Sequence, residues 1–137
     1  MLSSSISSDK PRVLLVDDNE AMLVRTAAVL APVCDVVGTA RNGLAAREAA
    51  TELRPDVIVL DISMPGMSGI ELAIRLREAG SNAALVFLTV HDDEELILAA
   101  QDAGGMGYVM KPRLGTDLLR AIQEARSRSV PSRGFTT

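Results

Sequence analysis

Short runs of apolar residues recur along the chain, and each one ends at a polar residue or a turn. Because these runs hardly alternate with polar residues and are too short for helices, they are typical of strands in a parallel sheet covered on both faces. The central run, Val57 to Leu60, ends abruptly at Asp61, and Pro65 and Gly66 then predict a loop. The predicted strands are residues 12–16, 34–39, 56–60, 84–88 and 108–110.

The segments between these runs carry apolar residues at helical spacing, and most begin at a capping residue. Asp18 or Asn19 is expected to cap the first helix, Ser68, with Glu71 at capping-box spacing, the third, and Thr116 the last. The first predicted helix has an apolar face formed by Met22, Leu23, Thr26, Ala27 and Leu30, and the others are residues 44–53, 68–79, 92–103 and 116–126. Five strands that alternate with five helices predict an α/β fold, a doubly wound parallel sheet with helices on both faces.

One domain accounts for most of the 137 residues. The serine-rich residues 1–10 are expected to form a disordered arm, and the fold is expected to occupy residues 11–126. Residues 127–137 are expected to be a flexible tail with no second domain after it.

Composition and charge argue against several classes of protein. The formal net charge of −4 gives no electrostatic case for direct binding to nucleic acid. The longest apolar run, residues 83–90, is too short to cross a bilayer, and residues 1–10 lack the apolar centre of a signal peptide. The single cysteine, Cys34, fits a reducing compartment. We therefore expect a cytoplasmic protein without a membrane partner.

Polar residues that could take part in chemistry follow four of the predicted strands. Asp17 and Asp18 follow the first strand, Asp61 the third, Thr89 the fourth and Lys111 the fifth. Because all strands of such a sheet end at one edge, these side chains should converge. Three carboxylates gathered in one place repel one another, so we expect a hard divalent cation, Mg²⁺, among their oxygens.

A phosphoryl group that reached Asp61 would meet the cation on one oxygen, Lys111 on another and the Thr89 hydroxyl on a third. Phosphoryl transfer needs mainly this positioning and charge neutralisation, and Asp61 is the natural nucleophile. Taken singly, Asp17 and Asp18 could be a helix cap, Thr89 a strand residue and Lys111 a solvated charge. Their joint occurrence at strand ends, in this order, favours a functional site.

Four motifs surround these residues. They are Val-Asp17-Asp18-Asn, Leu-Asp61-Ile-Ser-Met-Pro-Gly-Met-Ser-Gly69, Leu-Thr89-Val and Gly-Tyr108-Val-Met-Lys111-Pro112. In these motifs, and over roughly residues 11–126, the chain resembles the receiver domain of two-component response regulators, and most of all NarL/FixJ-type receivers. The resemblance implies a flavodoxin-like (βα)5 fold with strand order 2-1-3-4-5. It also implies phosphorylation of Asp61 by a sensor histidine kinase or phosphotransfer protein, in a signalling module that is not an enzyme.

The resemblance further implies a set of metal ligands. Asp18 and Asp61 would bind Mg²⁺ directly, the backbone carbonyl of Ser63 would complete the protein's share, and Asp17 would act through a metal-bound water. The Lys111–Pro112 peptide bond would be cis, which would aim the Lys111 ammonium toward Asp61.

The same resemblance implies a switch formed by Thr89 and Tyr108. Thr89 would move toward the phosphoryl group, the Tyr108 ring would follow, and the altered face would bind a partner or form a homodimer. The alternative is that Tyr108 simply packs on the sheet edge. His91, near the mouth of the pocket, would modulate loss of the phosphoryl group, and the alternative is a solvated loop residue.

Two departures from the family pattern leave the output open. The chain ends after the fifth predicted helix, so it is expected either to act alone or to be the receiver fragment of a longer DNA-binding transcriptional regulator whose helix-turn-helix domain is missing. Residues 104–107 are richer in glycine than is usual, which puts the rigidity of the expected loop before the fifth strand in doubt.

Two other classes of protein fit the motifs less well. A phosphatase of the haloacid dehalogenase type also uses a strand-end aspartate with Mg²⁺, but it requires a second aspartate at the position of Ser63. A flavin-binding electron carrier would need a Ser/Thr/Gly-rich phosphate loop where Asp17 and Asp18 stand.

Overall fold

The computed structural model describes the backbone of residues 10–134 and the side chains as far as Arg128. Within that range, five parallel strands form one sheet in the order β2-β1-β3-β4-β5. The strands are β1 (Arg12–Val16), β2 (Asp35–Ala40), β3 (Val57–Asp61), β4 (Ala84–Thr89) and β5 (Gly105–Met110). The predicted α/β class and strand order are confirmed.

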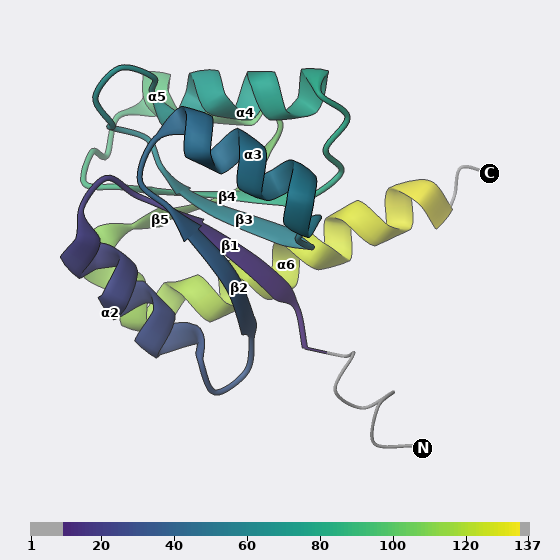
Figure 1. Cartoon of the computed structure of the whole chain (residues 1–137), viewed down its shortest axis with the longest axis horizontal. Helices are drawn as coiled ribbons and strands as arrows, with labels where there is room; N and C mark the ends of the chain where they lie inside the picture. The colour runs from purple at the N-terminus through teal and green to yellow at the C-terminus, as the bar shows by residue number, and fades with distance from the viewer. Residues whose placement is uncertain (1–9, 135–137) are drawn as a thin grey trace.

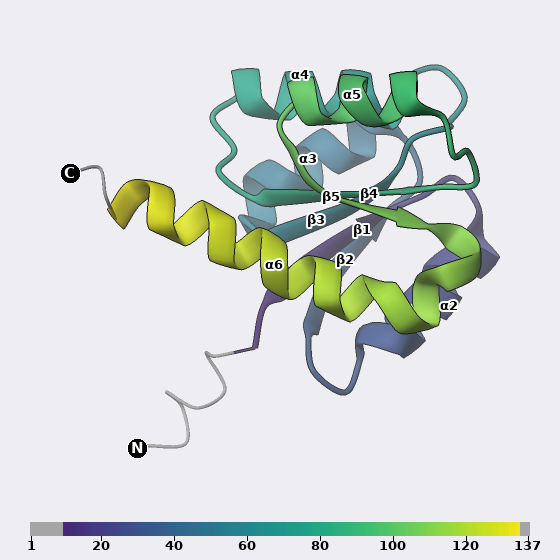
Figure 2. The ribbon, with the colours of Figure 1, turned by 180° about the vertical axis from the view of Figure 1, so that it is seen from behind.

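Helices cover both faces of this sheet. They are α2 (Glu20–Leu30), α3 (Gly43–Leu53), α4 (Gly69–Glu78), α5 (Glu94–Asp102) and α6 (Leu114–Gly134), with a 3₁₀ turn at Lys111–Arg113. Figures 1 and 2 show α2 and α6 on one face, and α3, α4 and α5 on the other. Among the described residues, no helix is both long and apolar enough to span a membrane.

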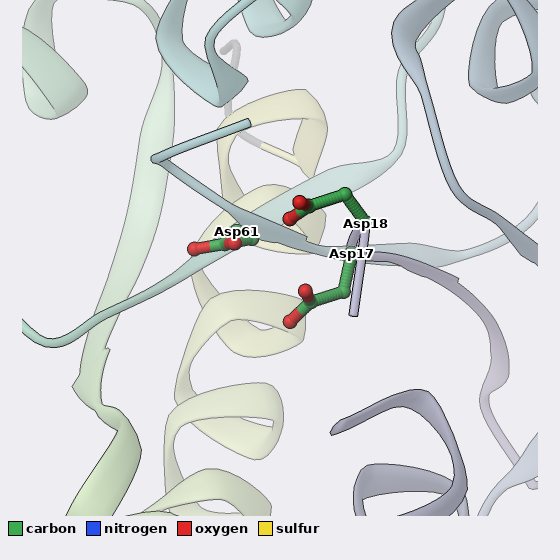
Figure 3. Close-up of side chains that lie close together, drawn as sticks. All are labelled: Asp17, Asp18 and Asp61. Atoms are coloured by element: carbon green, nitrogen blue, oxygen red, sulfur yellow. The ribbon is translucent and has the colours of Figure 1, made fainter. Parts of the chain in front are cut away.

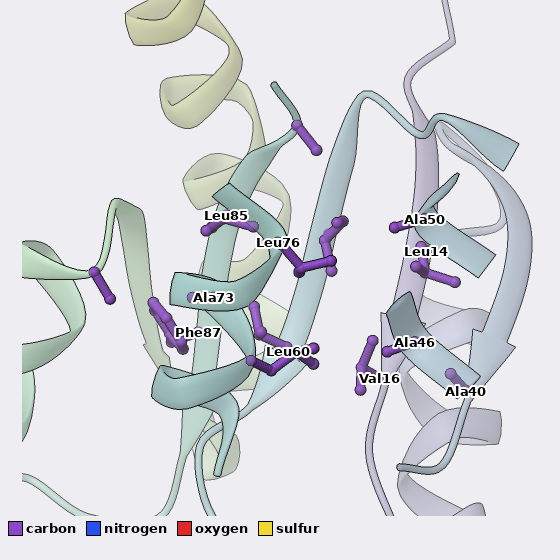
Figure 4. Packing of buried hydrophobic residues seen from close by; sticks show 14 of the residues in the cluster. Leu14, Val16, Ala40, Ala46, Ala50, Leu60, Ala73, Leu76, Leu85 and Phe87 are labelled. Atoms are coloured by element: carbon purple, nitrogen blue, oxygen red, sulfur yellow. The ribbon is translucent and has the colours of Figure 1, made fainter. Parts of the chain in front are cut away.

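The sheet divides the core into two apolar clusters, because alternate residues of a strand point to opposite faces. On β3, Ile58 and Leu60 lie in the cluster beneath α3 and α4, whereas Val57 and Val59 lie in the cluster beneath α2 and α6. Figure 4 shows part of the first cluster, which includes the fully buried ring of Phe87. Burial on both faces explains why the strand sequences do not alternate with polar residues.

Two of the predicted helix caps are confirmed and one is wrong. The Asn19 and Ser68 side chains each accept the backbone N–H three residues further on, at 3.1 Å in both cases. Thr116 is not a cap, because the 3₁₀ turn leads directly into α6 at Leu114. The Thr116 hydroxyl lies inside the first turn and donates to the carbonyl of Arg113 at 3.2 Å.

The predicted helix start at residue 92 is wrong, so the four acids of residues 92–95 do not all share its first turn. α5 begins at Glu94, and the Asp93 side chain caps it by accepting the Glu95 N–H at 2.9 Å. Asp92 therefore lies in the loop before the helix. An aspartate in the capping position satisfies an N–H that the first turn leaves without a partner, which favours this later start.

The predicted loop at residues 104–107 is also wrong, because β5 begins at Gly105. A Cβ atom at Gly105 would lie 2.5 Å from the Phe87 ring and 2.8 Å from the Ala100 carbonyl oxygen. The edge strand therefore passes so close to the core and to α5 that a side chain does not fit. The glycine is needed for this close packing and does not mark a loose connection.

The last helix is longer than predicted. α6 continues past Arg126 to Gly134, so the residues expected to begin a flexible tail are helical. On this extension, the Arg128 guanidinium donates to the carbonyl of Met106 on β5 at 2.8 Å. Residues 1–9 of the expected arm and the final residues 135–137 lie outside the described residues.

Gly69 lies where α4 packs closely against the end of β3, and substitution of this glycine tests that packing. Its N–H donates to the Ile62 carbonyl at 2.8 Å, and a Cβ atom there would collide with the Asp61 carbonyl. Gly69→Ala should therefore lower the free energy of unfolding by about 1–3 kcal/mol, as overpacking usually does. Urea unfolding measures this change.

Gly115→Ala is the matched control, since Gly115 also lies in a first helical turn but has open space, with no atom within 4 Å, where a Cβ would stand. It should leave stability unchanged or raise it by up to about 1 kcal/mol. Equal effects of the two substitutions would contradict the close packing at Gly69.

Candidate functional site

The ends of β1 and β3 place two aspartates side by side at the carboxyl edge of the sheet. Asp61 is the last residue of β3, and Asp17 directly follows β1. The Asp17 N–H donates to the Ala40 carbonyl at 3.0 Å, and the Ile62 N–H donates to the Leu88 carbonyl at 3.0 Å. These bonds continue the sheet ladder past the strand ends, so the backbone of both aspartates is fixed by neighbouring strands.

Three carboxylates meet at this edge. Oxygens of Asp17, Asp18 and Asp61 all lie within 4.8 Å of one another (Figure 3). Asp17 and Asp61 are only 3% and 4% exposed, and Asp18 is half-buried. At such distances two like charges repel by about 3–4 kcal/mol with an effective dielectric constant of about 20. The cluster therefore needs positive charge.

Lys111 supplies one positive charge. Its ammonium lies 3.2 Å from Asp17 Oδ2 and 3.3 Å from Asp61 Oδ2, and its side chain is largely buried. The predicted cis bond between Lys111 and Pro112 is wrong, because the described residues contain no cis peptide bond. A cis bond is also not needed to aim the Lys111 ammonium toward Asp61, since the 3₁₀ turn that begins at Lys111 brings the ammonium there with a trans bond.

The surroundings of Asp61 disfavour its charged form. Burial raises the pKa of the Asp61 carboxyl and the Asp17 charge raises it further, while Lys111 and the Ser63 N–H lower it. A carboxyl with a raised pKa costs stability above that pKa, and the cost disappears as the pH falls through it. Above this raised pKa, the ionised Asp61 therefore destabilises the cation-free fold.

The donor set fits a hard divalent cation. Asp17 Oδ2 is buried and accepts no hydrogen bond from the described residues, although the Lys111 ammonium is nearby. All the available ligand atoms are carboxylate or carbonyl oxygens, which suits Mg²⁺. Ser63 lies at the rim, where its N–H donates to Asp61 Oδ1 at 3.3 Å. The predicted role of the Ser63 carbonyl as a ligand stays a prediction.

Thr89 lies at the same sheet edge, and among the described residues its hydroxyl is hydrogen-bonded to a loop and not to a carboxylate. Its buried hydroxyl accepts the His91 N–H at 3.0 Å, and the Tyr108 hydroxyl donates to the His91 carbonyl at 3.2 Å. The Tyr108 ring packs against the cluster beneath α4. The backbone of His91 therefore links the two predicted switch residues, while its side chain is exposed.

Burial raises the pKa of the Tyr108 hydroxyl, and Asp93 and Asp92 raise it further, against an opposing effect of Thr89. The hydroxyl is therefore held in its protonated form as a donor. The Tyr108 ring packs on edge strand β5 with its hydroxyl bonded to the His91 carbonyl, so the choice between a switch and simple edge packing stays a prediction.

Arg41 is a residue of this edge that the sequence reasoning missed. Its guanidinium donates to the Asp18 carbonyl at 3.1 Å, beside the carboxylate cluster. Arg41 directly follows β2, so it stands at the same edge as the aspartates. That position is a usable signal, since every other member of the site also lies at the end of a strand or just after it.

Comparison with known proteins agrees with this geometry. The family model for the response regulator receiver domain matches residues 13–123. The nitrate/nitrite response regulator NarL of Escherichia coli K12 is 37% identical over 123 residues, which are 88% of this chain and 57% of that protein. The transcriptional regulatory protein LiaR of Bacillus subtilis is 34% identical over 116 residues, 83% of this chain and 55% of that protein.

A solved structure shows the same likeness. The signal receiver domain of the putative response regulator NarL from Mycobacterium tuberculosis superposes with a TM-score of 0.75 at 28% identity, covering 83% of this chain and 97% of that one. The chain spans little more than half the length of the two regulators named above. The family model covers most of the chain, and the fold and the aspartate cluster are consistent with that match. The chain therefore belongs to the response regulator receiver domain family.

Proposed function

We propose that this chain accepts a phosphoryl group on Asp61 from a histidine kinase or phosphotransfer protein. The observation that carries the proposal is the buried Asp61 carboxylate at the end of the central strand, with the Lys111 ammonium 3.3 Å away and two further carboxylates within 4.8 Å. An Asp61 oxygen attacks phosphorus, the bond from phosphorus to the donor nitrogen breaks, and its electron pair stays on the donor imidazole. Asp61 becomes an acyl phosphate.

The residues around Asp61 would divide the work of this transfer. Lys111 neutralises charge on the phosphoryl oxygens, and the Thr89 hydroxyl donates to one of them after leaving the His91 N–H. Asp18, Asp61 and the Ser63 carbonyl would hold Mg²⁺, with Asp17 acting through a bound water. When bound, the ion supplies a positive charge that polarises the phosphoryl group and offsets the carboxylate repulsion.

The output is proposed to leave through α5, β5 and α6. When Thr89 moves, the His91 backbone loses one of its two bonds to the switch residues, and Tyr108 can repack. The exposed acids of residues 92–95 border this face, so a protein partner or a second copy suits it better than nucleic acid. His91 remains proposed as a modulator of phosphoryl-group loss.

A second candidate is that the chain is the receiver part of a longer transcriptional regulator. It is favoured by the relatives NarL and LiaR, of which the chain covers only 57% and 55%. In either case the chemistry at Asp61 is the same, and only the target of the switched face differs.

Phosphorylation with a small phosphodonor and Mg²⁺ tests the acceptor. The wild type should gain one hydroxylamine-labile phosphoryl group, and Asp61→Asn should gain none, because the amide is a poor nucleophile. Asp102→Asn, which alters an exposed aspartate on α5, is the control and should label like the wild type. Equal labelling of Asp61→Asn and wild type would refute the assignment.

Mg²⁺ should stabilise the fold, because it relieves repulsion among the three carboxylates. At a concentration of one hundred times its dissociation constant, a ligand adds about 2.7 kcal/mol. Thermal unfolding with Mg²⁺ and with chelator should show this shift in wild type, and Asp18→Ala should lose most of it. Asp17→Ala should lose less. A full shift in Asp18→Ala would exclude Asp18 as a ligand.

Association measured with and without beryllium fluoride, a phosphoryl mimic, tests the switch. In wild type the mimic should strengthen self-association or partner binding by roughly 5- to 150-fold, the usual range for coupled sites. Thr89→Ala should abolish the change, and Thr51→Ala on the exposed face of α3 should retain it. Identical association in wild type and Thr89→Ala under both conditions would rule out Thr89 as the switch.

A further inference from the structure

The three carboxylates of the site are not held equally. Asp17 and Asp61 each accept a backbone N–H, and they share the Lys111 ammonium. Among the described residues, no hydrogen bond or ion pair reaches the Asp18 carboxylate, although Asp18 is the proposed direct ligand on this loop. Because the Asp18 carboxylate has no such partner, Asp18 must be held in place by contacts elsewhere on the residue.

The end of β2 provides that contact. The Ala40 carbonyl accepts the Asp17 N–H at 3.0 Å, and the next residue, Arg41, donates from Nη2 to the Asp18 carbonyl at 3.1 Å. Arg41 Nη1 also lies 3.7 Å from the Glu20 carboxylate, in the first turn of α2. The guanidinium therefore joins β2, the aspartate loop and the start of α2.

We propose that Arg41 is a positioning residue for the metal-binding loop, an inference that rests on the proposed Mg²⁺ site. By holding the Asp18 carbonyl, the guanidinium fixes the peptide plane between Asp18 and Asn19, and with it the direction of the Asp18 side chain. Mg²⁺ requires near-octahedral geometry, so a ligand held in advance binds it more tightly than a ligand that must be ordered on binding.

The direction in which removal of Arg41 changes Mg²⁺ affinity distinguishes a positioning role from a purely electrostatic one. Arg41 is a cation beside a cation site, so its charge by itself weakens Mg²⁺ binding. Its side chain is 58% exposed, which leaves that charge open to screening by salt. If Arg41 acted only through its charge, its removal would strengthen Mg²⁺ binding. If it positions Asp18, its removal weakens binding, and the loss persists when salt screens the charge.

Calorimetric titration with Mg²⁺ tests this at low salt and at about 1 M salt, where the Debye length is about 3 Å. Arg41→Ala should raise the dissociation constant about tenfold, the lower end for residues that orient metal ligands, at both salt concentrations. Arg41→Lys should recover part of the loss, because an ammonium can still donate one hydrogen bond to the carbonyl. Arg47→Ala is the control, since Arg47 is an exposed arginine on α3 whose side chain has no hydrogen bond or ion pair among the described residues.

Amide hydrogen exchange without Mg²⁺ gives a second measurement, independent of the ion. The Asn19 N–H, which donates to Asp17 Oδ1 at 2.9 Å, should exchange faster in Arg41→Ala and at the wild-type rate in Arg47→Ala. Unchanged or tighter Mg²⁺ binding by Arg41→Ala would overturn the proposal, as would an equal loss in Arg47→Ala. A wild type that bound no Mg²⁺ would overturn the metal site itself, while exchange at Asn19 would still report whether Arg41 holds the loop.

Discussion

The contact of one ammonium with two buried carboxylates is the interaction on which the site depends. Lys111 follows β5, yet its partners lie at the ends of β1 and β3, on the far side of β4. Neighbouring strands are about 4.8 Å apart, and β3 and β1 lie two and three strand spacings from β5, so the Lys111 side chain must reach back across the sheet edge to meet both carboxylates. It can do so only because the strands end in register, with Asp61 beside Leu88 and Thr89 beside Met110.

The fold bears a cost for keeping this site. Burial of Asp61, and then the nearby Asp17 charge that one lysine does not fully offset, raise the pKa of Asp61 and so disfavour its ionised form. The stability that offsets this cost comes from the two apolar clusters, in which the central strands are buried on both faces. The site therefore lies at the ends of strands that are buried on both faces, and this packing holds the unfavourable charges in position.

The elements around Asp61 separate into two halves. On the side of β1 and β2, backbone bonds and Arg41 hold the aspartate loop, which would bind the cation. On the side of β4 and β5, Thr89, the His91 backbone and Tyr108 form a connected set of hydrogen bonds that leads toward the surface of the sheet edge. Asp61 and Lys111 lie between the halves, so a group bound to Asp61 would contact both. Under the proposed function, a phosphoryl group on Asp61 would join this set of hydrogen bonds to the carboxylate cluster.

The sequence by itself determined the fold class, the strand order through its family resemblance, and the convergence of Asp17, Asp18, Asp61 and Lys111. The fold class and the convergence follow from patterns within single segments, because unalternating apolar runs require burial on both faces and parallel strands end at one edge. The start of α5 at Glu94 and the exclusion of Thr116 as a cap depend on neighbouring turns, which local signals describe poorly.

Only the tertiary structure decided how distant segments touch. The glycines before Tyr108 suggested a loop, but Gly105 is required where β5 crosses Phe87 and the end of α5. The trans peptide bond at Lys111 and the contact of Arg41 with Asp18 likewise depend on where a turn and a neighbouring strand end in space. Such contacts are set by the packing of segments far apart in the chain, so no pattern within one segment contains them.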